Sequence, residues 1–297
     1  MTDTLNTYLE TDNLYKILNS VSLIYFIVAL VMLWTAKLMM AKIVTSNLNE
    51  ELTKRDNKAV GVATAGYLFA VMIVIRGVLV SDADSVMAVA LGKDVLMTIL
   101  WSIISIILLL LSGWINDRFL LHRFSNKKEL IDDQNVGTAA VIAASFISTA
   151  MLIAAAANGV SHSSFALELL DTLVYFLAGQ IAFVGTGLAY QKFTKYDIHE
   201  EIKRDNAAAG ISFGLTLVAV AILLSGHLLR SDSLIGFIIW VPLSMVLLLI
   251  SRCLVNKALL PHSSIDEEIA IDQNWGVALI EGGVAIGTAL VINASFA

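Results

Sequence analysis

Residues 203–210 carry the sequence KRDNAAAG, which recurs almost unchanged as KRDNKAVG at residues 54–61. Two looser copies are DDQNVG at residues 132–137 and IDQNWG at residues 271–276. Each copy combines an acidic residue, an amide and a glycine, and each precedes a long apolar run. Four recurrences of one pattern indicate an internal repeat, which constrains the architecture before any other feature is considered.

The composition indicates a membrane protein. Of the 297 residues, 58% are hydrophobic and only 15% are charged, and the mean hydropathy is +0.80. A soluble domain is about half apolar and about a quarter charged. The net charge of −6 leaves no basic patch for nucleic acid. The lipid bilayer is therefore the expected surroundings of this chain, and nucleic acid is not an expected partner.

Eight apolar runs have a length close to the ~20 residues that cross a bilayer as a helix. Helix is the expected conformation because lipid offers the backbone no hydrogen-bond partners and no strand alternation is visible. The sequence thus predicts an all-α membrane protein with eight transmembrane helices. The expected helices cover residues 16–44, 59–80, 95–120, 136–158, 165–191, 207–229, 233–259 and 275–296.

The motif copies fall between helices one and two, three and four, five and six, and seven and eight, so all four lie on one face of the membrane. Of the 19 Lys and Arg residues, 15 lie on that side. Basic residues favour the cytoplasmic side of bacterial membrane proteins. The motif face is therefore expected in the cytoplasm of an inner (plasma) membrane protein, with both termini periplasmic.

The two halves of the chain align with little gapping. Lys42 matches Lys192, Asp56 matches Asp205, and the motif also relates the helix pairs within each half. The sequence thus predicts four parallel two-helix repeats, related by an axis along the membrane normal. The expected parts are a polar N-terminal tail at 1–15, a first tandem membrane domain at 16–158 (helices one to four) and a second at 159–297 (helices five to eight).

The helices differ in side-chain size. The even-numbered ones are rich in small residues, as in GTAAVIAASF at the start of the fourth and GGVAIG in the eighth. The odd-numbered ones are bulkier, as in IISIILLLL in the third. Small residues let membrane helices approach closely. The even helices are therefore expected to pack centrally, and the odd helices to face lipid more.

With its paired helices and recurring cytoplasmic turn, the chain resembles the YjfL-like domain-of-unknown-function 350 family, in two tandem copies over residues 14–296. The resemblance implies a bacterial inner-membrane protein and implies no agreed activity. The motif positions that carry it are Asp56, Asn57 and Gly61; Asp133, Asn135 and Gly137; Asp205, Asn206 and Gly210; and Asp272, Asn274 and Gly276.

The motif turns have two interpretations. Asp and Asn at a helix start accept hydrogen bonds from free backbone N–H groups and suit the positive helix end. The glycine four or five residues after the Asp then lets a neighbouring helix approach. In the second interpretation, the four acidic turns together form a cation or polyamine site, or the mouth of a pathway, on the cytoplasmic face.

Glu281 stands inside the eighth apolar run, about 7 Å beyond Trp275 and Gly276 at about 1.5 Å per residue. A carboxylate within a membrane helix is costly and is a candidate functional group. Three interpretations stay open: a structural pair with Lys37 or Arg252, which lie at comparable depth; proton or ion coupling; or an interfacial position without a role.

The sequence shows no metal-ligand spacing among its five histidines, no phosphate loop and no nucleophile–histidine arrangement. We therefore expect no enzymatic activity, no metal and no cofactor. The leading hypothesis is that the protein conducts, transports or senses a small cation or protons. The alternative is a structural or stress-associated scaffold that recruits a cytoplasmic protein through its turns. The small-residue faces also leave room for a homo-oligomer.

Overall fold

The computed structural model describes residues 22–44, 47–81, 91–158, 164–231, 233–258, 260 and 262–296. This part of the chain is helical and has no strand. Eight of its helices are long and apolar enough to cross a membrane, which confirms the expected all-α multi-pass fold. They are α3 (Ser22–Val44), α5 (Lys58–Ser81), α6 (Leu91–Ile115), α8 (Val136–Ala157), α9 (Phe165–Phe193), α11 (Ala207–Leu228), α12 (Leu234–Ala258) and α14 (Trp275–Ser295). The expected tail at 1–15 lies outside the described residues.

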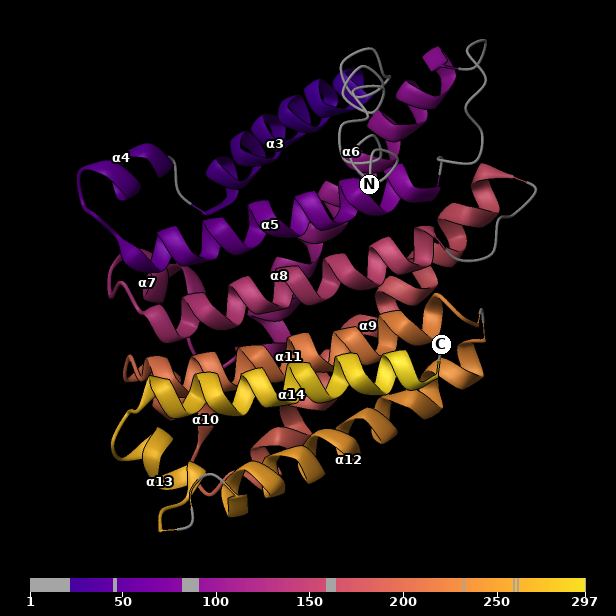
Figure 1. Ribbon diagram of the computed structural model, residues 1–297. Coiled ribbons are helices and arrows are strands. Elements are labelled where there is room, and N and C mark those ends of the chain that lie inside the picture. Colours follow the sequence, from indigo (N-terminus) through magenta and orange to yellow (C-terminus); the bar gives the residue numbers. More distant parts are fainter. Residues whose placement is uncertain are drawn as a thin grey trace, which may run out of the picture.

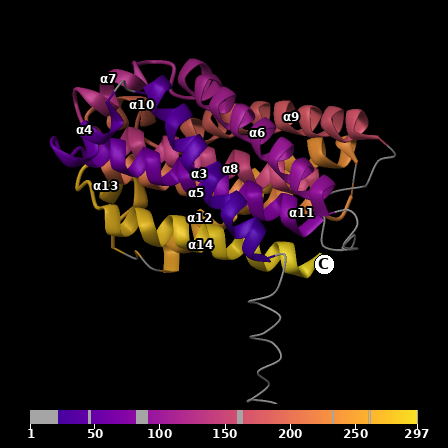
Figure 2. The same cartoon turned by 90° about the horizontal axis from the view of Figure 1, so that it is seen from above.

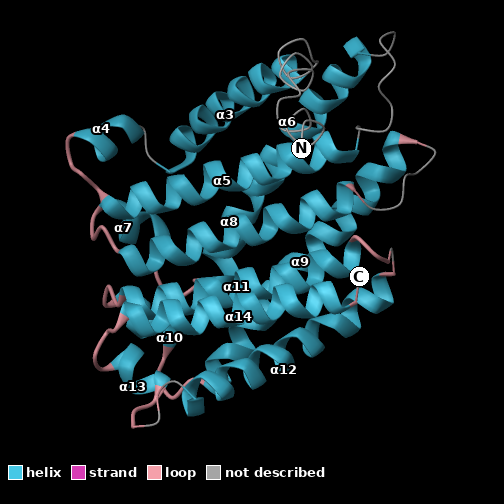
Figure 3. Cartoon of the chain, viewed as in Figure 1, coloured by secondary structure: helices cyan, strands magenta, loops and turns pink. Residues whose placement is uncertain are grey.

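Four short helices that the sequence did not predict lie at one end of the molecule (Figures 1 and 3). They are α4 (Leu48–Thr53), α7 (Asn126–Ile131), α10 (Ile198–Lys203) and α13 (Ile265–Ala270). Each directly precedes a copy of the motif and buries one or more apolar side chains. A π-helical turn, η1 (Asn116–Leu120), extends α6 toward the same end. We call this end of the molecule the motif end.

The second, fourth, sixth and eighth membrane spans, which are α5, α8, α11 and α14, form a row. Helix α5 packs on α8, α8 on α11, and α11 on α14, in the order of the chain. Figure 1 shows α5, α8 and α11 side by side, with α14 next to α11, α3 beyond α5 at one end and α12 beyond α14 at the other. Seen from above, α6 and α9 lie together on one side of α8 and α11 (Figure 2). The motif turns therefore follow one another along the row.

Small residues decide how closely the helices of the row approach. A Cβ atom added at Gly66 of α5 would collide with Ala143 of α8, and one at Gly210 of α11 would collide with the backbone of Gly137 in α8. Over the most apolar window, 78% of α11 but only 33% of α14 is buried. The expected central position is thus confirmed for α5, α8 and α11. It is wrong for α14, one side of which no other described residue covers.

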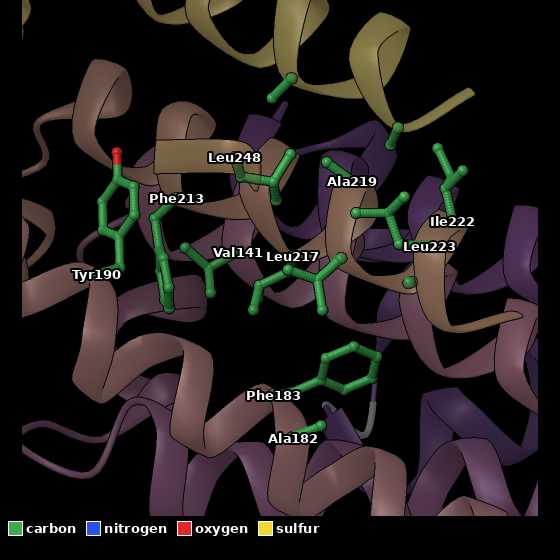
Figure 4. Packing of buried hydrophobic residues seen from close by; sticks show 14 of the residues in the cluster. Val141, Ala182, Phe183, Tyr190, Phe213, Leu217, Ala219, Ile222, Leu223 and Leu248 are labelled. Atoms are coloured by element: carbon green, nitrogen blue, oxygen red, sulfur yellow. The ribbon is translucent and has the colours of Figure 1, made fainter. Parts of the chain in front are cut away.

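The largest apolar cluster surrounds α11. Phe213 and Leu217 of α11 contact a cluster that includes Val141 of α8, Phe183 of α9 and Leu248 of α12, and Figure 4 shows these side chains turned toward one another. A helix that is apolar on every side is typical of the interior of a bundle. The deepest core of the molecule therefore lies in its second half, beside the site described next.

Candidate functional site

The asparagine of each motif copy begins the helix of the row that follows it. Asn135, Asn206 and Asn274 each accept a hydrogen bond from the backbone N–H three residues later, over 2.8, 3.2 and 3.3 Å. Asn57 does the same for Val60 over 3.0 Å. These bonds satisfy backbone donors that the first turn of a helix leaves free. The capping interpretation is thus correct for the asparagines.

The residue before each asparagine has a left-handed backbone conformation. The φ angles are 48° at Asp56, 52° at Gln134, 61° at Asp205 and 50° at Gln273. Non-glycine residues rarely adopt this conformation, although Asp tolerates it better than most. The same unusual backbone thus precedes the capping asparagine at all four places. The four two-helix repeats stay a prediction, but these four junctions share one local geometry.

Each asparagine amide group also contacts its own short helix and, in three of the four units, reaches the next short helix. Its Nδ2 donates to a glutamate of the short helix before it, and in the first three units it also donates to a backbone carbonyl of the next short helix. The glutamate acceptors are Glu51, Glu129, Glu201 and Glu268. The carbonyl acceptors are Leu130 for Asn57 (2.9 Å), Ile202 for Asn135 (2.6 Å) and Ile269 for Asn206 (2.8 Å).

These glutamates are not among the residues predicted from the sequence, although a signal for them exists. A glutamate stands five or six residues before every motif asparagine. Glu129 is buried to 4% exposure, and burial raises its pKa although the hydrogen bond from Asn135 opposes the shift. At Glu268, which is in the same position in the last unit, the Asn274 amide lowers the pKa instead.

The motif aspartates do not gather into one site. Asp205 accepts a hydrogen bond from the backbone N–H of Val136 in α8 over 3.0 Å, and Asp133 pairs with Lys128 over 3.1 Å. Asp56 and Asp272 are exposed. The described residues contain no group of three or more His, Cys, Asp or Glu that could hold a metal ion. The geometry therefore gives no support to a shared cation site at these turns.

Glu281 lies in a buried ion pair. Its side chain is 4% exposed and contacts the Arg252 guanidinium of α12. The hydroxyl of Ser212 in α11 donates to its second carboxylate oxygen over 2.5 Å. Of the two basic partners that the sequence left open, the structure places Arg252 against Glu281. Lys37 lies on α3, which packs on α5 and α6 at the other end of the row (Figure 1).

The pair belongs to a larger polar cluster that joins five helices, α9, α11, α12, α13 and α14. Arg252 donates to the hydroxyl of Tyr190 in α9 over 2.8 Å and, through its other terminal nitrogen, to Asp266 of α13 over 2.8 Å. The Tyr190 hydroxyl lies 2.6 Å from that of Ser212. The sequence gives no signal that Tyr190, Ser212 and Asp266 belong to this cluster, because each lies on a different element from Glu281 and the pattern of one helix does not show its neighbours.

A cavity of about 40 Å³ adjoins the cluster. One water molecule needs roughly 10–15 Å³ of such volume, so there is room for about three. Arg252, Glu281 and Tyr190 line its polar side, and the remaining wall is largely apolar and includes Leu248 and Met245. The site is thus a small, partly open and mostly apolar pocket that the buried ion pair helps to line.

A second polar cluster lies at the motif end outside the membrane spans. Arg123 pairs with Asp197 over 2.5 Å, and the His199 ring contacts the Leu120 carbonyl at the end of η1 over 2.9 Å. His122 packs edge-on against His199. Burial, together with the positive charge of Arg123, lowers the pKa of His199 below its usual 6.5. This cluster ties the third helix of the first half to α10.

The fold and the buried ion pair define a multi-pass α-helical membrane protein with a charged cluster inside its second half. The sequence pattern of the Domain of Unknown Function (DUF350) family matches residues 11–157 and again 164–296. The chain therefore belongs to this family and carries two copies of its domain, as the resemblance implied.

A comparison with curated proteins finds a UPF0719 transmembrane protein of Aquifex aeolicus (strain VF5). It is 33% identical over 102 residues, which are 33% of this chain and 37% of that protein. The chain thus matches a little over a third of the relative's length. No solved structure matches the chain.

Proposed function

We propose that this protein moves or senses protons or a small cation through the cluster of Glu281, Arg252 and Asp266. The supporting observation is the charge balance, since one guanidinium is shared between two carboxylates. With all three groups ionised, the cluster carries one uncompensated negative charge. Uncompensated charge in a low-dielectric interior is costly. A proton or a small cation that enters the adjoining cavity would balance it.

The geometry also links the charge state to the motif end. Arg252 contacts Glu281 in the membrane span and Asp266 on the short helix α13. Neutralising Glu281 weakens its hold on the guanidinium and leaves Asp266 as the stronger partner. A change of charge at Glu281 would thus shift Arg252 and, with it, α13. This link suits either a transport step or a sensor. It assigns no catalytic step to the protein, and the predicted orientation puts the cluster near the cytoplasm.

The test uses purified protein in liposomes with an internal pH dye and an imposed proton or potassium gradient. We expect flux from the native protein that Glu281→Gln changes several-fold, and a smaller change for Asp266→Asn. The matched control is Asp272→Asn, which removes an exposed carboxylate of a motif turn and should leave the flux unchanged. Size-exclusion profiles establish that each variant is folded. Equal flux for the native protein and Glu281→Gln, or none from either, would contradict transport through this cluster.

A scaffold is the second candidate, and the joined short helices favour it. The asparagine–carbonyl bonds connect α4, α7, α10 and α13 into one ridge, on which Lys54 and Arg204 expose 75% and 69% of their side chains. A ridge of this kind would offer a charged docking surface. If a scaffold is the main role, Lys54→Ala with Arg204→Ala should release a co-purifying partner, while Glu281→Gln should not.

A further inference from the structure

The last helix of the row presents a face that no other part of the described chain covers. A Cβ atom added at Gly283 or Gly287 of α14 would meet nothing within 4 Å, and one at Gly276 would meet only the cap Asn274 of its own unit. Trp275 and Leu279 on this helix are 60% and 44% exposed. The equivalent face of α8 is filled by α11, and that of α11 by α14.

The first helix of the row, α5, packs on α3, α6 and α8, but it also has one face that no described residue covers. A Cβ atom added at Gly61 of α5 would reach only Leu52 of its own short helix, at 3.8 Å. Ala65 is exposed, as are Phe69 (59%) and Met72 (41%) farther along the helix. The row thus begins and ends with two different open faces.

The open faces of α14 and α5 resemble the two sides of the contact between α8 and α11 within the chain. Gly210 packs on Gly137, and the Cβ position of Gly214 lies 2.9 Å from that of Ala144. When the two halves of the chain are aligned, Gly276 and Gly283 of α14 take the places of Gly137 and Ala144 in α8. Gly61 and Ala65 of α5 take the places of Gly210 and Gly214 in α11. Small residues thus stand at all four positions where a second α8–α11 contact would need them.

The hydrogen bonds across the α8–α11 contact give a second, independent match. There, Asn135 donates to the Ile202 carbonyl, and the Val136 N–H donates to Asp205. At the end of the row, Asn274 and the Trp275 N–H occupy the donor positions without any such acceptor among the described residues. At its start, the Leu52 carbonyl and the Asp56 carboxylate occupy the acceptor positions, and they too have no such donor in the described part of the chain.

We propose that α14 of one copy packs against α4 and α5 of a second copy, in the way that α8 packs against α10 and α11 within the chain. Helices α14 and α5 both begin at the motif end, so the two copies share one orientation in the membrane. The contact joins two different faces, so it is heterologous and builds a ring if the rotation closes and a longer row if it does not. This inference does not depend on the ion pair of Glu281.

Cysteine crosslinking of the full-length protein in native membranes tests the contact. Cys253 is the chain's single cysteine, so Cys253→Ser supplies a cysteine-free background. We expect Ala65→Cys combined with Gly283→Cys to form a ladder of dimers and larger species under mild oxidation on a non-reducing gel. Each single variant should stay monomeric. Co-expression of the two single variants with different tags should give one mixed dimer and no ladder.

Two leucine variants separate the contact from folding. Gly61→Leu in the double-cysteine protein should remove the ladder, because the equivalent Gly210 packs directly on the Gly137 backbone. The new leucine at position 61 has room within a single copy, so the fold itself should be kept. Gly92→Leu on α6, also in open space, should leave the ladder intact. Ala144→Cys with Gly214→Cys serves as the intrachain control. The proposal fails if that control crosslinks while the Ala65–Gly283 pair does not, or if Gly283→Cys alone forms dimers.

Discussion

At the scale of single residues, the asparagine of the motif does more than cap a helix. In the first three units its side chain joins three structures: the first turn of its own helix, the glutamate of its own short helix and the carbonyl of the next unit. These three asparagines are almost fully buried by their partners: Asn57, Asn135 and Asn206 are at most 2% exposed. Asn274 is only partly buried, and among the described residues its amide has no short-helix carbonyl to donate to.

This difference predicts unequal costs for one substitution at two equivalent sites. Asn135→Ala removes a cap and leaves Glu129 and the Ile202 carbonyl without their donor, so we expect a loss of about 2–4 kcal/mol in the free energy of unfolding. Asn274→Ala removes the cap and one part-buried hydrogen bond to Glu268, with an expected loss of about 1 kcal/mol. Thermal unfolding of the detergent-solubilised monomer measures both. Equal losses would mean that the carbonyl link contributes little.

His199 predicts a pH dependence of stability. Burial, helped by the neighbouring Arg123 and His122, lowers its pKa in the folded protein below the usual 6.5. The unfolded chain therefore binds more protons below pH 6.5, and the stability should fall as the pH drops through and below that value. Asp197, the carboxylate of this cluster, titrates at still lower pH.

The melting temperature measured at pH 7.5 and at pH 5.5 tests this expectation. His199→Gln keeps a side chain that can donate to the Leu120 carbonyl but cannot titrate in this range. We expect a smaller loss on acidification in that variant than in the native protein. A loss of the same size in both proteins would assign the pH dependence to other groups.

At the scale of the elements, close approach between helices of the row depends on a few positions without side chains. A membrane offers no hydrophobic force between helices, so packing and interhelical hydrogen bonds hold them together. The Gly137–Gly210 contact provides the close packing, and the nearby bond from Asn135 to the Ile202 carbonyl provides the hydrogen bond. The motif asparagine and the motif glycine stand close together in the sequence because the same helix–helix contact uses both.

Gly210→Leu tests the close approach. The new side chain would meet the Gly137 backbone, which cannot rotate away, and overpacking of this kind costs about 1–3 kcal/mol or more. We expect a lower melting temperature and a smaller yield of folded protein. Gly92→Leu is the matched control, because a Cβ atom there meets nothing within 4 Å. A native-like Gly210→Leu variant would show that α8 and α11 separate easily.

At the scale of the whole molecule, the two copies of the domain continue one another. The α8–α11 contact crosses from the first copy to the second and is supported outside the membrane by the Arg123–Asp197 pair and the His199–Leu120 contact. Inside the membrane, Gln180 donates to Thr149 over 3.1 Å. These contacts hold the two halves together both within the spans and at the motif end. The halves are therefore not two independent domains joined only by a linker.

Co-expression of the two halves as separate chains, residues 1–158 and 159–297, tests this continuity. We expect them to co-purify through the α8–α11 contact, and Gly210→Leu in the second half should reduce the amount of complex. Gly92→Leu in the first half should not. Recovery of two stable halves that do not associate would contradict a continuous row.

The sequence by itself determined the number of spans, their boundaries within a few residues, and the common side of the four motifs. These features follow from hydropathy and from a repeated local pattern, which need no knowledge of neighbours. It also placed Glu281 at the depth of both Lys37 and Arg252. Depth is a property of position along one helix, so it could not choose between the two.

Tertiary structure alone decided which helices lie side by side. It placed α12 beside α14 and thereby selected Arg252, and it put α3 at the far end of the row with Lys37. It also decided that α14 ends the row and stays exposed, although its small residues resemble those of the buried α8. The physical reason is that lateral packing joins residues far apart in the chain, through contacts that the pattern of a single helix does not contain.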